Sequence, residues 1–100
     1  MTNHFIRVLF DVKRCDHLGV DPAYRLYLND ELFTEREWSI ENSYYFEELM
    51  QISAPVGTYC IKLITVPPGI TEFKMSEFRV EVGPGRIIDH EHGIIEIYEN

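Results

Sequence analysis

Apolar and polar residues alternate along the first part of the chain, over residues 5–14. Four apolar side chains occupy alternate positions of this segment: Ile6, Val8, Phe10 and Val12. Because side chains two residues apart share one face of a strand, the pattern predicts a half-buried strand. Phe5 and Leu9 fall on the other, mostly polar face, which indicates that this second face is partly covered too.

Two short arms enclose the pair Asn29-Asp30. In the first arm three apolar side chains alternate with polar or amphipathic ones: Tyr24, Leu26 and Leu28. The second arm runs over residues 31–36, and asparagine and aspartate tolerate the positive φ angles that a tight two-residue turn needs. We therefore predict a β-hairpin. Because an isolated hairpin is marginal in water, we expect the rest of the chain to be organised around it.

The segment 44–52 fits two patterns. With a period of two its apolar side chains share a face on which Glu48 is the exception; with a helical period Tyr45, Leu49 and Ile52 form a stripe behind a Ser43 cap. We predict a strand, because paired aromatic residues favour strands and the flanking segments are strands. One short helix near 44–52 is the alternative.

The second half of the chain continues with strand patterns. We predict a strand over residues 58–66, a strand over residues 77–82, and a closing hairpin with arms at 86–88 and 94–98. In the second of these segments Phe78, Val80 and Val82 alternate with charged residues.

These elements amount to seven to eight short strands separated by turn residues, without a long helical pattern. The chain is therefore predicted to be all-β, an antiparallel, jelly-roll-like β-sandwich that forms a single domain over residues 1–100. An open sandwich has edge strands that need a partner or protection, and we expect the first and last strands to be the edges.

Composition and charge exclude several classes of function. The formal net charge is -8 and the isoelectric point is about 4.8, so phosphate backbones and anionic lipids would repel the protein, and we predict neither a nucleic-acid nor a membrane partner. The start of the chain lacks the pattern of a signal peptide, and no apolar run reaches membrane-spanning length. Synthesis in a cytoplasm is therefore expected.

Two clusters could carry metal chemistry. His90 and His92 lie two residues apart, so a strand would aim both imidazoles to one side, where they could bind a transition metal. A third ligand would have to come from elsewhere, and the candidates are His4, His17, Asp16 and Cys15. A solvent-exposed hairpin tip is the favoured explanation, so we predict no metal site and no cofactor.

The second cluster is a run of carboxylates, from Asp30 to Glu48, which could bind calcium but lacks the regular spacing of a calcium loop. A solvated acidic surface is favoured. No nucleophile lies in a recognisable catalytic motif, so we predict that the protein is not an enzyme. Cys15 and Cys60 are expected to be reduced, with a bridge only if the first and fifth strands are neighbours.

Several aromatic side chains lie close together in the chain and are the candidate binding residues: Tyr24, Tyr27, Trp38, Tyr44 and Tyr45. Their flat faces suit stacking on sugar rings or anchoring a protein interface. Ordinary core packing is the alternative explanation for most of them.

The run Tyr27–Arg36, followed by Ala54–Tyr59, resembles small proteins of tailed phages, particularly cyanophages, and the similarity extends from Phe5 to about Val82. This resemblance implies a non-enzymatic, virion-associated structural protein that docks on a capsid or tail as an accessory or decoration protein. The implied partners are other virion proteins or further copies of the chain in a homo-oligomer. The implied location is the virion, after synthesis in the host bacterial cytoplasm.

The same layout, a Tyr-x-Asn-Asp hairpin followed by Pro-x-Gly-Thr-Tyr, also looks like small sandwich modules that bind carbohydrate, some through calcium. For this alternative the resemblance implies a glycan partner. Trp38 and the tyrosines would stack on the sugar, and acidic residues would bind calcium or hydroxyl groups.

Overall fold

The computed structural model describes residues 2–14, 23–38, 45–66 and 72–99. These residues form eight strands: β1 His4–Arg14, β2 Ala23–Leu28, β3 Glu31–Glu37, β4 Tyr45–Ala54, β5 Gly57–Val66, β6 Phe73–Val82, β7 Gly85–Asp89 and β8 Ile94–Ile97. None of the described residues is helical, and accordingly no helix among them has the length and apolar character needed to cross a membrane.

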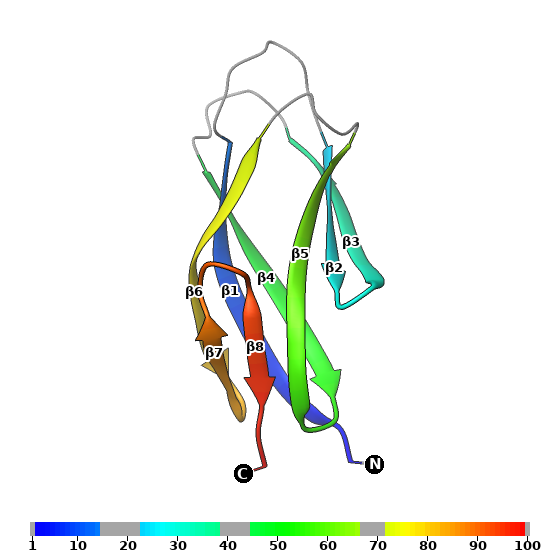
Figure 1. The fold of residues 1–100 in the computed structure, drawn as a ribbon, viewed down its shortest axis with the longest axis vertical. Coiled ribbons are helices and arrows are strands. Elements are labelled where there is room, and N and C mark those ends of the chain that lie inside the picture. Colours follow the sequence, from blue (N-terminus) through cyan, green and yellow to red (C-terminus); the bar gives the residue numbers. More distant parts are fainter. Residues whose placement is uncertain (1, 15–22, 39–44, 67–71, 100) are drawn as a thin grey trace.

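The strands form two antiparallel sheets that pack face to face (Figure 1). One sheet has three strands in the order β4-β1-β6, and the other has five in the order β3-β2-β5-β8-β7. The predicted all-β antiparallel sandwich is therefore confirmed.

The core lies between the sheets and is built on the alternation of β1. All four of the predicted inward side chains of β1 have no exposed surface: Ile6, Val8, Phe10 and Val12. On the facing sheet the buried side chains include Tyr24, Leu26, Ile61, Ile95 and Ile97. Phe10 also stacks on Phe78 of β6, with ring centroids 4.8 Å apart.

The prediction for the sheet edges was wrong. β1 lies between β4 and β6, and β8 lies between β5 and β7, so both strands are interior. The edge strands among the described residues are β4 and β6 in one sheet and β3 and β7 in the other. The hairpin of β2 and β3 lies at one side of the five-stranded sheet, so it is not the centre of its layer, whereas β1 is the central strand of the three-stranded sheet.

The structure settles the ambiguous segment as a strand. β4 pairs with β1 over ten consecutive residues, which excludes the short helix near 44–52 for the described part of that segment. Residue 44 lies outside the described residues.

The predicted hairpin is also confirmed, with one difference in its turn. Asn29 has a φ of 55°, whereas Asp30 does not have a positive φ. Asn29 also joins the hairpin tip to β5: its N–H donates to the Cys60 carbonyl at 2.7 Å, and its Oδ1 accepts from the Cys60 N–H at 2.9 Å.

Candidate docking surface

The outer face of the three-stranded sheet carries apolar side chains that the core does not use. Phe5, Leu49 and Val82 are 42%, 46% and 41% exposed, respectively, and Leu9 between them is 8% exposed. We call these four residues the outer apolar patch. The sequence pattern had indicated partial cover on this face of β1, and neighbouring side chains on the sheet provide that cover for Leu9.

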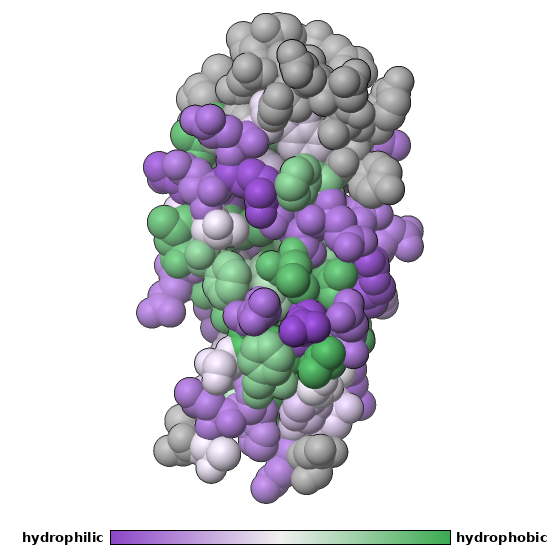
Figure 2. Space-filling view, turned by 180° about the vertical axis from the view of Figure 1, so that it is seen from behind, coloured by the Kyte–Doolittle hydropathy of each residue, from purple (hydrophilic) through white to green (hydrophobic). Residues whose placement is uncertain are grey.

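Strand register brings the patch together. Leu9 of β1 lies directly opposite Leu49 of β4, and Arg7 lies opposite Val82 of β6. Side chains opposite one another in an antiparallel pair share a face, so all of these residues lie on the same outer surface. Figure 2 views the molecule from this side and shows hydrophobic side chains gathered around its middle, bordered by hydrophilic ones.

Two ion pairs lie on the same face, and their arginines stand among the patch side chains: Arg7 lies opposite Val82, and Arg79 lies opposite Leu9. The Arg7 guanidinium lies 3.2 Å from a Glu81 carboxylate oxygen, and the Arg79 guanidinium lies 2.5 Å from a Glu47 carboxylate oxygen. Both pairs are about half exposed and are individually worth little to stability. The Nε atom of Arg7 is buried and has no hydrogen-bond partner among the described residues. Exposed apolar side chains mixed with arginine and other polar groups also occur in protein–protein interfaces.

The candidate aromatic residues are not gathered on one surface. Tyr24 is fully buried and Trp38 is 4% exposed, and both ring systems pack around Phe73, at centroid distances of 5.2 and 5.3 Å. Their inward direction follows from strand register, because Tyr24 faces the other sheet from β2. In this structure neither side chain can stack on a sugar or contact a partner.

The remaining candidate aromatics are separated from these. Tyr27 is half-buried on the outer face of the five-stranded sheet, opposite Leu32 of β3. Tyr44 lies outside the described residues, as does the side chain of Tyr45. Among the described side chains, the candidate aromatic residues that reach the surface are therefore reduced to Tyr27.

A buried carboxylate is the feature that sequence reasoning missed. Glu48 of β4 is 1% exposed and points into the core beneath Arg36 of β3. Arg36 donates to both carboxylate oxygens, through Nε and through Nη2 at 3.2 Å, and the Tyr24 hydroxyl donates to the same carboxylate. The sequence did contain a signal for this site, because Glu48 is the exception on the apolar face of the predicted strand.

The electrostatics of this cluster follow from its burial. Burial raises the pKa of Tyr24 far above its usual value, and the hydrogen bond to Glu48 raises it further. The hydrogen bond to Glu48 also raises the pKa of Arg36. Arg36 in turn lies over the Phe46 ring, with its guanidinium carbon 4.5 Å from the ring centroid. Tyr24 and Arg36 thus keep their protons and donate hydrogen bonds to a single carboxylate, which suits a structural role.

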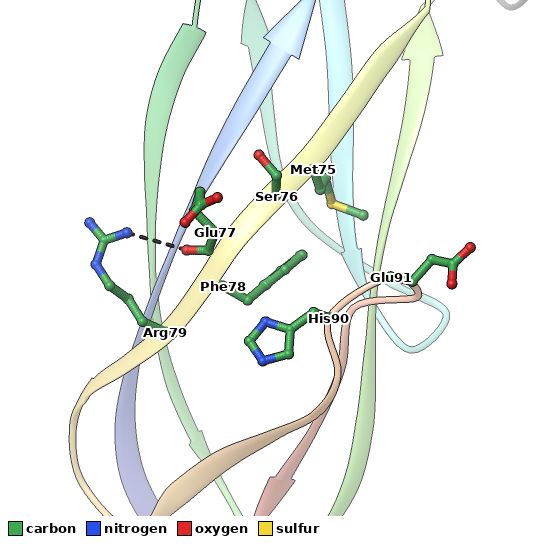
Figure 3. Close-up of a pocket in the computed structure, with 7 residues that line it drawn as sticks. All are labelled: Met75, Ser76, Glu77, Phe78, Arg79, His90 and Glu91. Carbon is green, nitrogen blue, oxygen red and sulfur yellow. Dashed lines mark hydrogen bonds between the residues drawn. The ribbon is translucent and has the colours of Figure 1, made fainter.

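His90 and His92, the pair considered as metal ligands, do not converge. His92 Nδ1 lies 2.8 Å from an Asp89 carboxylate oxygen, and His90 instead lines an open groove of about 540 Å³ between β6 and the turn that joins β7 to β8 (Figure 3). Phe78, Glu77 and Glu91 line the same groove. Within the described part of the chain, no three His, Cys, Asp or Glu side chains are placed to hold a metal ion. Of the suggested third ligands, His17, Asp16 and Cys15 lie outside the described residues.

Hydrogen bonds to Asp89 fix the turn between β7 and β8. One oxygen of Asp89 accepts from the backbone N–H groups of Glu91 and His92, at 3.0 and 3.1 Å. The His92 hydrogen bond lowers the pKa of Asp89, and the same contact raises the pKa of His92. The side chain of Asp89 therefore closes this turn, and both of its carboxylate oxygens already contact groups of the turn.

The carboxylates proposed for calcium are also dispersed. Glu35 pairs with Arg25 at 2.5 Å on the outer face of the five-stranded sheet, Glu47 pairs with Arg79 on the opposite side of the molecule, and Glu48 is buried. Cys60 is a free, half-buried thiol on β5, and Cys15 lies outside the described residues. β1 and β5 lie in different sheets, so the condition set for a Cys15–Cys60 bridge is not met.

No family model, no curated protein and no solved structure is significantly similar to this chain. The resemblance to proteins of tailed phages therefore stays a prediction.

Proposed function

We propose that the protein is a non-enzymatic structural protein that docks on a larger protein particle, a phage capsid or tail, as an accessory or decoration protein. The observation that carries the docking part of this proposal is the outer apolar patch on the β4-β1-β6 sheet. The sequence resemblance of residues 27–36 and 54–59 supports the choice of a phage particle as the partner.

The chemistry of the patch supports a protein partner over a glycan or a nucleic acid. Its apolar members are three aliphatic side chains and Phe5, which bind by excluding water from complementary apolar surface. The ion pairs Arg7–Glu81 and Arg79–Glu47 lie on the same face, where paired charges would set the orientation of a protein partner. A net charge of -8 opposes a phosphate backbone.

Two measurements test the proposal. Mass spectrometry of purified tailed-phage particles from the source of the sequence should detect the chain as a particle component. Added purified protein should then co-sediment with particles that lack it, in a saturable manner.

Charged substitutions test the surface itself. Phe5→Asp combined with Val82→Asp places two carboxylates in the patch and is expected to weaken particle binding by roughly tenfold or more. Ile64→Asp is the matched control, because Ile64 is 46% exposed on β5 of the other sheet. The proposal fails if the chain is missing from particles and does not bind them, or if the control and the patch variant lose binding equally.

A further inference from the structure

Three of the four edge strands carry an extra, bulged residue, and the fourth does not. Phe33 is inserted in β3, Glu77 and Glu81 interrupt the register of β6, and Ile88 is inserted in β7. Bulges on edge strands prevent pairing with a further strand, because they twist the edge and break its row of hydrogen-bonding groups. In this protein they protect every described edge except that of β4.

β4 has the properties of a strand that accepts a partner. Its register against β1 is continuous from Tyr45 to Ala54, and its sequence contains neither proline nor lysine. In the described sheets it pairs with β1 alone, so alternate backbone N–H and C=O groups of β4 point away from the sheet. Neither of its charges guards the edge, since Glu47 is paired with Arg79 and Glu48 is buried beneath Arg36.

From this edge we infer that two copies of the chain associate through β4, pairing antiparallel about a two-fold axis that passes beside Leu49. The result is a continuous six-stranded sheet in the order β6-β1-β4 followed by β4-β1-β6 of the second copy. This inference deepens the proposed function by naming one partner of the chain, but it is testable without any particle.

Side-chain chemistry selects a second copy and this register. Opposite residues in an antiparallel pair share a face, so the axis must pass beside a single residue and not between two. With the axis at Leu49, the two exposed Leu49 side chains face each other, and Glu47 faces Gln51 of the second copy. No glutamate then faces a glutamate, whereas an axis at Glu47 or Glu48 would place that glutamate opposite its own copy.

The same register extends the apolar surface. Leu9 lies opposite Leu49 within each copy, so the row Leu9–Leu49 of one copy continues directly into Leu49–Leu9 of the other. An axis at Met50 would instead place Leu49 opposite Gln51 and break this row.

Charged substitutions at Leu49 test the inference. Leu49→Lys and Leu49→Glu each place like charges directly against each other across the axis, so each variant alone should associate at least about tenfold more weakly than the wild type. An equimolar mixture of the two variants should restore dimers, because lysine then faces glutamate. Sedimentation velocity and light scattering report the mass, and circular dichroism reports whether each variant is folded.

A second pair of variants does not alter an apolar residue. Gln51 is exposed on β4 and faces Glu47 of the second copy in the proposed register. Gln51→Lys should therefore strengthen association, and Gln51→Glu should weaken it. Ile88→Lys is the control, because Ile88 is 51% exposed on the bulged edge strand β7 and should leave the mass unchanged.

Each result decides the question. A wild type that is monomeric at every concentration overturns the inference, as does a Leu49→Lys variant that dimerises like the wild type. A mixture of Leu49→Lys and Leu49→Glu that stays monomeric overturns the two-fold register. Wild-type dimers that do not bind particles support the inference while the proposed function fails, so the two proposals are separable.

Discussion

At the scale of single residues, Glu48 is the most consequential side chain in the core. A buried carboxylate is tolerated only when its charge is paired and its oxygens accept hydrogen bonds, and Arg36 and Tyr24 provide both. The alternation of β4 signalled that Glu48 lies on the apolar face. Its partners could not be predicted, because they come from β2 and β3 and meet Glu48 only across the sandwich.

Removing this carboxylate should destabilise the fold. We expect Glu48→Ala to lower the free energy of unfolding by about 3 kcal/mol, the lower end for breaking a buried pair, because the Arg36 side chain is 40% exposed and can be partly rehydrated. Tyr24→Phe removes one donor and keeps the ion pair, so it should cost about 1 kcal/mol. Urea unfolding curves measure both values. Equal stability of Glu48→Ala and the wild type would contradict the structural role of the cluster.

The Asp89–His92 pair should titrate as a unit. The carboxylate stabilises the protonated imidazole, so the pKa of His92 lies above its usual 6.5 and that of Asp89 lies below its usual 3.8. The contribution of His92 to stability is therefore complete below pH 6.5 and is lost as the pH rises through its raised pKa. The contribution of Asp89 is present above pH 3.8 and is lost as the pH falls through its lowered pKa.

Nuclear magnetic resonance titration of the His92 ring checks this expectation. Asp89→Asn should return the pKa of His92 towards 6.5, and Glu91→Gln should lower it less, because Glu91 acts on His92 only through its charge at a distance. An unchanged His92 titration in Asp89→Asn would show that the contact is absent in solution.

At the scale of elements, bulges explain where sequence periodicity succeeded and where it did not. The period of two predicted β1 and β5 because these interior strands are regular. In β6 the alternation Phe73, Met75 is interrupted at Glu77 and resumes at Phe78 and Val80, so the predicted strand began too late. The second bulge, at Glu81, turns Val82 to the outer face, where it joins the patch instead of the core.

The backbone conformation at the Glu77 bulge leads to a prediction about stability. Glu77 has a φ of 56°, which costs a residue with a side chain about 1–2 kcal/mol. Glu77→Gly should therefore raise the free energy of unfolding by about 0.5–1 kcal/mol, after the greater flexibility of glycine in the unfolded chain is deducted. Lys74→Gly, on the regular part of β6, should instead lower it by about 1 kcal/mol. Thermal or urea unfolding compares the two, and a loss of stability in both would contradict the assigned backbone conformation.

Strand order was the part of the fold that periodicity could not supply. Alternation shows which side chains face inward, but neighbours in a sheet are chosen by contacts between segments far apart in the sequence. The first strand therefore became the centre of its sheet, and β4, whose two patterns were difficult to separate, became an edge of that sheet. The candidate surface depends on that order, because Leu9 and Leu49 meet only through the β1–β4 register.

At the scale of the whole molecule, the net charge of -8 opposes association of the chain with further copies of itself. Two copies that pair through β4 bring their charges together while burying apolar side chains, so repulsion and burial act against each other. Added salt shortens the range of the repulsion, from about 30 Å at 0.01 M to about 10 Å at 0.1 M. Salt at these concentrations does not weaken the contact between the apolar side chains of the two copies.

Self-association should therefore tighten as salt is added, which is opposite to the behaviour of an interface held by ion pairs. The same reasoning predicts tighter association as the pH falls towards the isoelectric point of about 4.8, because the net charge then approaches zero. Sedimentation equilibrium at several sodium chloride concentrations measures the first effect. The mixture of Leu49→Lys and Leu49→Glu is the control, because its central lysine–glutamate pair is weakened by salt and should offset part of the gain. If the wild-type dimer dissociated as salt was added, charge attraction, and not the leucine row beside β4, would have to hold the two copies together.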